Sequence, residues 1–212
     1  MLFVYGEGQT EALFVRNVLN PSFFLSRGES ATAIVAQGLR PFAKTQTALL
    51  DLLRHPSAQV TTFIDYYALP ADYPGMPHRK PPPGNPAHAY LKVARLEQAL
   101  AETISHPRFI PYYSLHEFEA LAFTDPAAIN TQRQRVAAGT VIPQVTQMRD
   151  QAQGNPELVN DNETTSPSRR IMSLWPTGQY QKTVDSVGIV QRIPLATLRA
   201  ACRHFDCWLG QL

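Results

Sequence analysis

The sequence predicts an α/β protein in which a mostly parallel, Rossmann-like sheet is flanked by helices. Apolar runs alternate with helical patterns through the first two-thirds of the chain, as expected when strands and helices form separate layers. Acidic residues follow three of the apolar runs almost directly, and this is where open α/β sheets place their ligand sites. From about Asp125 onward the pattern changes to helices and loops, which predicts a helical C-terminal extension.

Four short apolar runs are the candidate strands. Leu2–Tyr5, Val60–Ile64 and Phe109–Tyr113 are the clearest, and Ala33–Ala36 is a weaker candidate. Runs of this length without polar alternation are typical of strands buried on both faces. We therefore expect them to form the interior of the sheet.

Six segments show apolar residues at helical spacing. They are Thr10–Leu19, Thr45–Arg54, Ala87–Thr103, Gln132–Ala138, Val145–Gln153 and Pro194–Leu209. The polar stretch Gly154–Arg170 is rich in turn-forming residues and is expected to be a loop. These elements predict an α/β core over residues 1–125 and a helical and loop extension over residues 126–212, packed on the core as a single compact unit.

The segment Pro70–Pro86 contains seven prolines and two glycines, so it cannot form a core strand or helix. Long irregular segments inside compact domains are unusual and often functional. Two interpretations stay open: a flexible surface insertion, or a substrate-facing loop in which His78, Arg79 and Lys80 meet phosphate.

Composition excludes several classes of protein. The chain has 212 residues and a formal net charge of +2, so its overall charge does not indicate nucleic-acid binding. No stretch approaches the ~20 apolar residues of a membrane span, and the first residues do not resemble a signal peptide. Cys202 and Cys207 match no zinc pattern and are expected to be reduced. We therefore expect a soluble cytoplasmic protein that does not associate with a membrane.

Two glutamates stand at the end of the first predicted strand. Glu7 lies between Gly6 and Gly8, immediately after the apolar run. Glu11 follows four residues later, so in a helix that begins here both carboxylates can face the same point. Two acids at one strand end suggest a bound metal more than they suggest packing.

Three further carboxylates follow later strands. Asp65 comes directly after Val60–Ile64, and Glu117 and Glu119 follow Phe109–Tyr113. Because strand ends along one edge of a parallel sheet are neighbours, these groups can converge with Glu7. In a helix Glu117 and Glu119 would point in different directions, so we favour Glu117 as the site residue and keep Glu119 second. We interpret His116 as a structural histidine.

A site made only of oxygen ligands suits Mg²⁺ or Mn²⁺ better than zinc. Such ions commonly act on phosphate substrates, and two of them ~4 Å apart can cleave a phosphodiester. A basic residue would then stabilise the charge of the transition state. Arg169, Arg170 and Lys182 are the candidates.

Six segments spread along nearly the whole chain carry a resemblance to a known family: Glu7–Glu11, Phe63–Tyr67, Arg108–Leu121, Asn155–Asn160, Ser166–Ile171 and Cys202–Leu209. Together they resemble the Toprim-related family of unknown function DUF 4276, and the first of them is similar to the Glu-x-x-x-Glu of OLD-type nucleases. The resemblance implies a Toprim-like fold and a metal centre at Glu7, Glu11 and Asp65. It also implies a phage-defence setting and a partner ATPase.

Two positions depart from that family pattern. Typical Toprim proteins have Asp-x-Asp where this chain has Asp65 followed by Tyr67 at the second position, so one metal ligand is missing there. Arg169 stands where the family pattern has Lys, and Arg donates a proton less readily. Either Glu117 or Glu119 replaces the missing ligand, or one metal binds instead of two.

We therefore expect a metal-dependent nuclease or nuclease subunit that acts on DNA or RNA. Glu7, Asp65 and Glu117 would hold metal, with Glu11 supporting the site and Glu119 as a further candidate metal ligand. Arg169 or Lys182 would stabilise phosphate. The alternative is a catalytically degenerate binding module that docks on an ATPase or on nucleic acid. A weaker third possibility is a phosphohydrolase of small nucleotides. Assembly as a homo-oligomer is compatible with each of these functions.

Overall fold

The chain folds as two compact units. The computed structural model describes residues 1–36, 38, 40–76, 86–159 and 165–212. The first unit comprises Met1–Ser114 and Trp208–Leu212, and the second comprises Leu115–Cys207. The sequence analysis placed the boundary between residues 125 and 126, whereas the second unit begins directly after the last strand. The basic segment 78–80 lies outside the described residues.

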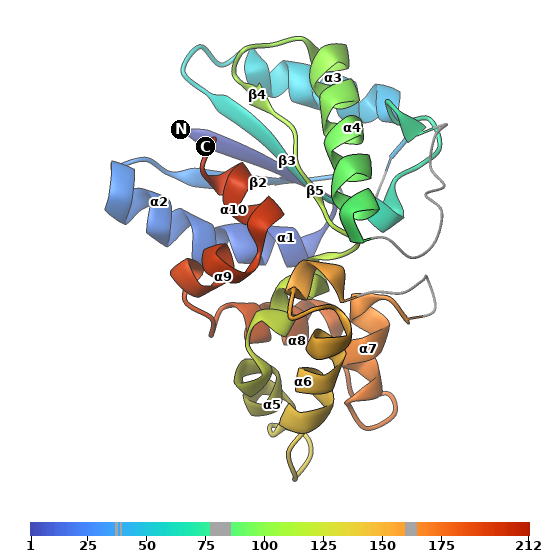
Figure 1. The fold of residues 1–212 in the computed structure, drawn as a ribbon. Coiled ribbons are helices and arrows are strands. Elements are labelled where there is room, and N and C mark those ends of the chain that lie inside the picture. The colour runs from blue at the N-terminus through green and yellow to red at the C-terminus, as the bar shows by residue number, and fades with distance from the viewer. Residues whose placement is uncertain (37, 39, 77–85, 160–164) are drawn as a thin grey trace. The chain divides into compact units, whose positions relative to one another are not determined.

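The first unit is built on a parallel sheet with the strand order β2-β1-β3-β4, and β5 also pairs with β3 (Figure 1). The strands are β1 (Leu2–Gly6), β2 (Ala31–Val35), β3 (Gln59–Asp65), β4 (Phe109–Ile110) and β5 (Tyr113–Ser114). A parallel sheet with flanking helices and a helical C-terminal region confirms the predicted fold class. All four predicted strand regions contribute to it.

The central strand β3 is buried on both faces, which explains its apolar sequence. On one face Phe63 contacts the ring of Phe14, and the indole Nε1 of Trp208 donates to Thr61 Oγ1 at 2.8 Å. Trp208 also stacks on Tyr112, with ring centroids 4.3 Å apart. The last residues of the chain therefore complete the core of the first unit.

Four α-helices accompany this sheet. Figure 1 shows the first two on one side of it and the other two on the opposite side. They are α1 (Gln9–Phe14), α2 (Asn20–Arg27), α3 (Phe42–Leu53) and α4 (Pro86–Ile104). The alternation of sides follows from the strand order, because right-handed crossovers that run in opposite directions along a sheet lie on opposite faces.

The helix predicted at Thr10–Leu19 is longer and less regular than expected. Between α1 and α2 the backbone forms a π-helical turn, η1 (Val15–Leu19). Pro21 lies in the first turn of α2 and has no N–H to donate to the preceding turn. A π-helical turn lets the chain pass this residue without ending the helical run.

The strand predicted at Phe109–Tyr113 is interrupted by Pro111. Proline cannot donate to the ladder, so β4 and β5 are separate two-residue strands. The Thr62 hydroxyl bridges the gap, since it accepts from the Tyr112 N–H and donates to the Tyr112 carbonyl, both at 2.8 Å. The prediction of one continuous strand is therefore wrong at this residue.

The second unit is helical. Its elements are η4 (the 3₁₀ segment Phe118–Thr124), α5 (Pro126–Arg133), α6 (Ile142–Gln151), η5 (the 3₁₀ turn Pro156–Leu158), α7 (Pro167–Ser173), α8 (Lys182–Val190), α9 (Leu195–Ala201) and α10 (Arg203–Leu209). The last helix crosses into the first unit at Trp208. Among the described residues, no helix is long and apolar enough to cross a lipid bilayer.

Several helix predictions for this unit need correction. Helix α5 begins earlier than expected because the Asp125 carboxylate accepts from the Ala127 N–H at 2.8 Å and so caps it. The expected helix Pro194–Leu209 breaks at Cys202, where the buried Glu157 accepts from the N–H groups of His204 and Phe205 and starts a new helix. The predicted loop Gly154–Arg170 contains η5 and the start of α7, and α8 was not predicted.

We predict that Trp208 is needed for the stability of the first unit. Trp208→Ala removes the stack on Tyr112 and should lower the free energy of unfolding by about 3–5 kcal/mol. Trp208→Phe keeps an aromatic ring but leaves Thr61 Oγ1 without its indole donor. This loss should lower the free energy of unfolding by about 1–3 kcal/mol. Urea unfolding followed by circular dichroism measures both, and equal stability of Trp208→Ala and the natural chain would contradict the prediction.

Candidate functional site

The end of β1 is shaped by close contact between Gly6 and Glu11. A β-carbon on residue 6 would lie 2.8 Å from the β-carbon of Glu11, a separation that side chains do not tolerate. Glu11 also accepts the Gly8 N–H through Oε2 at 2.7 Å, which caps α1. Glycine at position 6 therefore lets the first helical turn, with its buried carboxylate, press against the strand.

The β1–β3 register brings Glu7 and Asp65 to the same edge of the sheet. Gly6 pairs with Phe63, so Glu7 is one residue past the last pair and Asp65, the last residue of β3, is two residues past it. Asp65 pairs in turn with Ser114 of β5. Asp65 and Glu11 are each only 6% exposed, and Glu7 is partly buried. Three of the predicted site carboxylates thus gather at one edge of one unit.

Tyrosines and a lysine surround this edge. Burial raises the pKa of Tyr73 to about 12, while its hydrogen bond to Thr45 lowers it and the negative charge of Glu7 contributes to the rise. The ammonium of Lys92 lies 5.0 Å from the centre of the Tyr66 ring. The carboxylates therefore lie in a partly desolvated setting in which their charges act on neighbouring groups.

The side chains at this edge can be compared with the ligands that a hard divalent cation prefers. All three candidate ligands are carboxylates, which suit Mg²⁺ and Mn²⁺. Over the described ranges no group of three or more His, Cys, Asp or Glu side chains is placed to hold a metal ion. Mg²⁺ is usually bound through one or two carboxylates, with waters and substrate phosphates completing its shell, so a smaller set of ligands from this edge remains chemically suitable.

The second unit holds the remaining predicted site residues. Glu117 is partly buried and accepts the Ser168 N–H through Oε2 at 2.8 Å. This contact ties Glu117 to the first turn of α7, which also carries the exposed Arg169. Glu117 therefore contacts the first turn of the helix that carries Arg169.

Glu119 is fully buried beside a lysine. Its Oε1 accepts from the Ser186 hydroxyl at 2.9 Å, and its Oε2 lies 3.5 Å from Lys182 Nζ. Burial raises the pKa of Glu119, and the Glu117 carboxylate adds to the rise, whereas the Lys182 ammonium and the Ser186 hydroxyl lower it. The half-exposed Lys182 thus balances a buried carboxylate and holds its ammonium at the surface of the unit.

Ser186 and Tyr180 complete this cluster, and neither was predicted as a site residue from the sequence. Their hydroxyl oxygens lie 2.7 Å apart, so Tyr180, Ser186 and Glu119 form a continuous hydrogen-bonded chain. Ser186 follows Lys182 by four residues on α8, and this spacing would have indicated a shared helix face. The signal was lost because α8 was not predicted.

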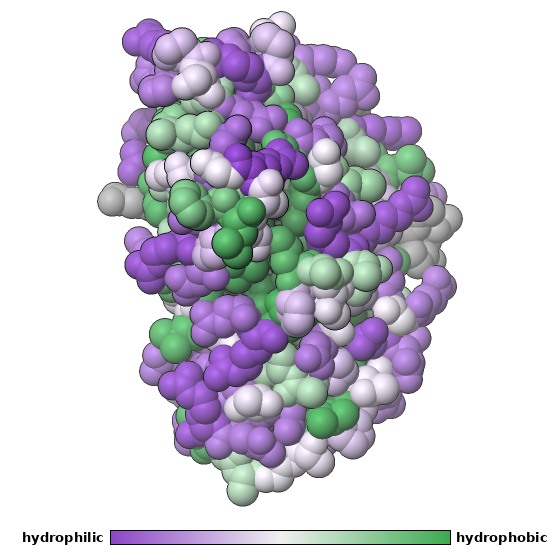
Figure 2. Space-filling view, turned by 90° about the vertical axis from the view of Figure 1, so that its left-hand side faces the viewer, coloured by the Kyte–Doolittle hydropathy of each residue, from purple (hydrophilic) through white to green (hydrophobic). Residues whose placement is uncertain are grey.

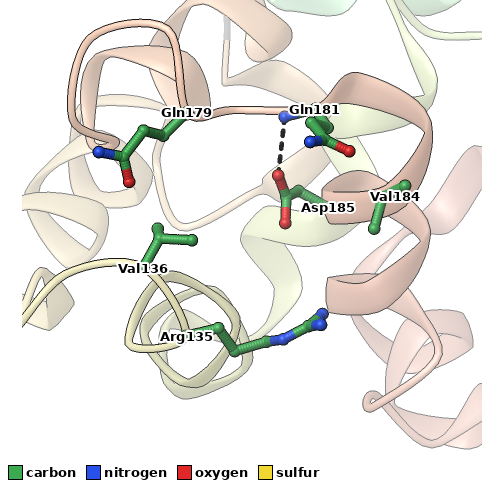
Figure 3. Close-up of a pocket in the computed structure, with 6 residues that line it drawn as sticks. All are labelled: Arg135, Val136, Gln179, Gln181, Val184 and Asp185. Carbon is green, nitrogen blue, oxygen red and sulfur yellow. Dashed lines mark hydrogen bonds between the residues drawn. The ribbon is translucent and has the colours of Figure 1, made fainter.

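A pocket lies beside α8 (Figure 3). Its lining residues are Arg135, Val136, Gln179, Gln181, Val184 and Asp185. The Asp185 carboxylate is already occupied, because it accepts from Gln132 Nε2 and from the Gln181 N–H, both at 2.8 Å. None of the predicted site residues lines this pocket, so it is distinct from the carboxylate clusters.

The family model described as "Domain of unknown function (DUF4276)" matches residues 6–212. The chain belongs to the DUF4276 family. The match begins at the glycine that packs against Glu11 and includes every carboxylate and basic residue discussed above. The family resemblance predicted from the sequence motifs is therefore confirmed.

The C-terminal region of the Burkholderia pseudomallei OLD protein is similar to the chain with a TM-score of 0.48 and 14% sequence identity, over 99% of this chain and 95% of that one. None of the curated proteins matches the chain.

We predict that Gly6→Ala disturbs the first unit far more than Gly8→Ala does. The new β-carbon at position 6 meets the Glu11 side chain and should lower the free energy of unfolding by about 1–3 kcal/mol. At position 8 the nearest atom would be Glu11 Oε2 at 3.6 Å, an ordinary contact, and the backbone there is extended. Thermal and urea unfolding of both variants test this, and equal effects would refute it.

We predict that His116 makes the second unit sensitive to acid. Burial lowers the pKa of His116 to about 4 from its usual 6.5, so the unfolded chain binds the proton more readily than the folded one. The free energy of unfolding therefore keeps its full value above pH 6.5 and decreases as the pH falls towards 4, by roughly 3 kcal/mol in all.

The test compares urea midpoints at pH 7 and pH 4.5. His116→Asn should flatten the difference, because asparagine tolerates the positive φ of 74° at this position. The exposed His55→Asn serves as the control and should keep the pH dependence of the natural chain. An unchanged pH dependence in His116→Asn would show that other groups are responsible.

Proposed function

We propose that the protein is a divalent-metal-dependent nuclease, or the nuclease subunit of a larger system. The observation that carries this proposal is the gathering of Glu7, Glu11 and Asp65 at the carboxyl edge of two adjacent parallel strands. Such an edge is the usual ligand site of open α/β sheets, and carboxylate oxygens are the ligands that hard divalent cations prefer.

Each of these carboxylates would have a distinct role. Glu7 and Asp65 would bind the ion, and Glu11, whose Oε2 is held by the Gly8 N–H, would orient the first helical turn and support the site. A bound Mg²⁺ or Mn²⁺ would supply charge neutralisation at the phosphate and a more acidic bound water. The close packing at Gly6 keeps the Glu11 carboxylate at its place on the strand end.

The second unit would contribute groups that recognise phosphate. Glu119 holds the Lys182 ammonium at the surface, where a flexible point charge can pair with a phosphate oxygen. Arg169 is exposed on the helix whose first turn is bound by Glu117, and its guanidinium suits bidentate contact with phosphate. Cleavage of a DNA or RNA backbone, a partner ATPase and a phage-defence role in the cytoplasm belong to this proposal through the family resemblance.

Two observations favour a second function, a non-catalytic binding module. Tyr67 occupies the position of the second metal-binding Asp, and no set of three metal-binding side chains is grouped within the described residues. A domain of this kind would bind nucleic acid or a partner ATPase without cleaving a substrate. Titration with Mn²⁺ separates the two functions, since a nuclease should show a metal-dependent rise in melting temperature and a module should not.

The nuclease proposal predicts that Glu7→Gln and Asp65→Asn each reduce Mg²⁺- or Mn²⁺-dependent cleavage by about a hundredfold or more, because each removes a charge that would hold the ion. The assay follows labelled single- and double-stranded DNA and RNA with each metal. Both variants are isosteric, so their melting temperatures without metal should stay close to that of the natural chain.

Glu102→Gln is the matched control. Glu102 is exposed on α4 and hydrogen-bonds only to Gln98 among the described residues, so its neutralisation should leave cleavage unchanged. Cleavage at the natural rate by both Glu7→Gln and Asp65→Asn would reject the proposal. Cleavage by none of the chains, with no response to Mn²⁺, would favour the binding module.

A further inference from the structure

A buried carboxylate faces the pocket beside α8. Asp185 is 7% exposed, and Figure 3 shows its side chain between Gln181 on one side of the pocket and Arg135 on the other. Its Oδ1 accepts from Gln132 Nε2, and its Oδ2 accepts from the Gln181 N–H. A carboxylate oxygen has two lone pairs, so each oxygen of Asp185 can accept one more hydrogen bond. The pocket therefore offers two neighbouring acceptors to a ligand.

The negative charge of Asp185 is held by amide groups alone. Within the described part of the chain its donors are one side-chain amide and one backbone N–H, and no residue forms an ion pair with it. A buried carboxylate is stabilised by further hydrogen bonds, because burial has removed it from water. A ligand that brings two N–H donors would gain most from this group.

Arg135 supplies the opposite charge at the rim of the same pocket. Its side chain is exposed, and over the described ranges it takes part in no ion pair. A guanidinium presents its N–H donors in a planar fork, which suits two neighbouring acceptors on one ligand. The pocket thus combines a pair of acceptors at Asp185 with a forked donor at Arg135.

Two valines add apolar surface to the pocket. Val136 and Val184 are 43% and 50% exposed. Hydrophobic residues also lie exposed among hydrophilic ones elsewhere on the surface (Figure 2), so the valines are informative only because they line a pocket with charged groups. The pocket has a volume of about 180 Å³, whereas sites for drug-sized ligands measure about 300–1,000 Å³. Its size therefore suits one ring system.

We propose that this pocket binds a guanine base. The Watson–Crick edge of guanine carries two neighbouring donors, N1–H and the 2-amino group, and the Asp185 carboxylate would accept from both. The O6 and N7 atoms follow on the adjoining edge, and they are acceptors that an arginine such as Arg135 can bind in a bidentate manner. Val136 and Val184 would contact the ring, as apolar side chains do in pockets that read a single base.

The other bases match these groups less well. Adenine and cytosine each have a ring nitrogen that accepts beside their amino group, and uracil and thymine have a carbonyl oxygen on both sides of their one N–H donor. Each of these bases would bring an acceptor against the Asp185 carboxylate. Such a contact leaves a buried polar group unpaired, which is an effective way to reject a wrong ligand.

Guanine can come from two sources, a free nucleotide or a single-stranded nucleic acid. Double-stranded nucleic acid is excluded, because its Watson–Crick edges are paired and the base would have to leave the stack. No residue of the pocket is among the proposed metal ligands or phosphate contacts. The guanine site is therefore independent of the proposed nuclease reaction.

Isothermal titration calorimetry of the full chain in EDTA tests the base preference without any contribution from metal-dependent cleavage. The probes are the 5′-monophosphates of guanosine, inosine, adenosine, cytidine and uridine. Inosine lacks the 2-amino group and should bind about tenfold more weakly than guanosine, because one hydrogen bond to a charged group is lost. The other three should bind more weakly still. Equal affinity for all five nucleotides overturns the proposal.

Oligonucleotides distinguish the two sources. The probes are a single-stranded oligothymidine with one central guanine, the same strand with inosine in its place, and the duplex of the guanine strand. Guanine-dependent binding that is tighter for the single strand than for the nucleotide assigns the site to nucleic acid, and equal affinities assign it to a free nucleotide. Absence of guanine-dependent binding to both the nucleotide and the single strand overturns the proposal.

Variants place the binding in this pocket. Asp185→Asn turns an amide donor towards the guanine donors, so it should lower the affinity for the guanine probe at least tenfold and abolish its preference over inosine. Arg135→Gln removes the forked donor and should also weaken binding about tenfold. Arg203→Gln is the matched control, since Arg203 is exposed and lies outside the pocket.

The two pocket variants differ in their risk to the fold. Asp185 is buried and hydrogen-bonded, so the melting temperature of Asp185→Asn is measured first. Arg135 is exposed, and its variant, together with the inosine comparison on the natural chain, decides the question if Asp185→Asn does not fold. A folded Asp185→Asn chain that still prefers guanine, or equal effects of Arg135→Gln and Arg203→Gln, rules out this site.

Discussion

The close approach of the Glu11 side chain to Gly6, which has no β-carbon, determines how the first unit presents its acidic groups. Helix α1 can start directly after β1 only because no β-carbon stands between the helix and the strand. The parallel register with β3 then places the end of that strand beside Asp65. A single missing side chain thus decides whether carboxylates from a helix and from two strands share one edge.

The two units stabilise their buried carboxylates in different ways. At the sheet edge, Glu11 is stabilised by a backbone N–H at the start of a helix, which also benefits from the helix dipole. In the second unit, Glu119 relies on a hydroxyl and on a lysine that remains half exposed. The first arrangement fixes a carboxylate in place, whereas the second keeps a cation accessible to a ligand.

Much of the first unit could be predicted from residue order, and much of the second could not. Strands such as Leu2–Tyr5 and Val60–Ile64 are buried on both faces, so they can be recognised in the sequence as apolar runs. The positions of Glu7 and Asp65 at the sheet edge follow from that pattern alone. Helix α8 is different, because it is buried on several sides and its Asp185 and Ser186 bond to Gln132 and Glu119, which lie 53 and 67 residues earlier in the chain. Tertiary hydrogen bonds of this kind produce no periodic pattern of apolar residues from which a helix could be predicted.

The return of Trp208 to the first unit has a consequence for synthesis on the ribosome. All of Leu115–Cys207 must be made before the indole that covers Tyr112 and donates to Thr61 becomes available. At the usual rate of translation this takes roughly five to twenty seconds. During that interval one face of β3 lacks its final cover, so the nascent chain exposes apolar surface that a chaperone could bind.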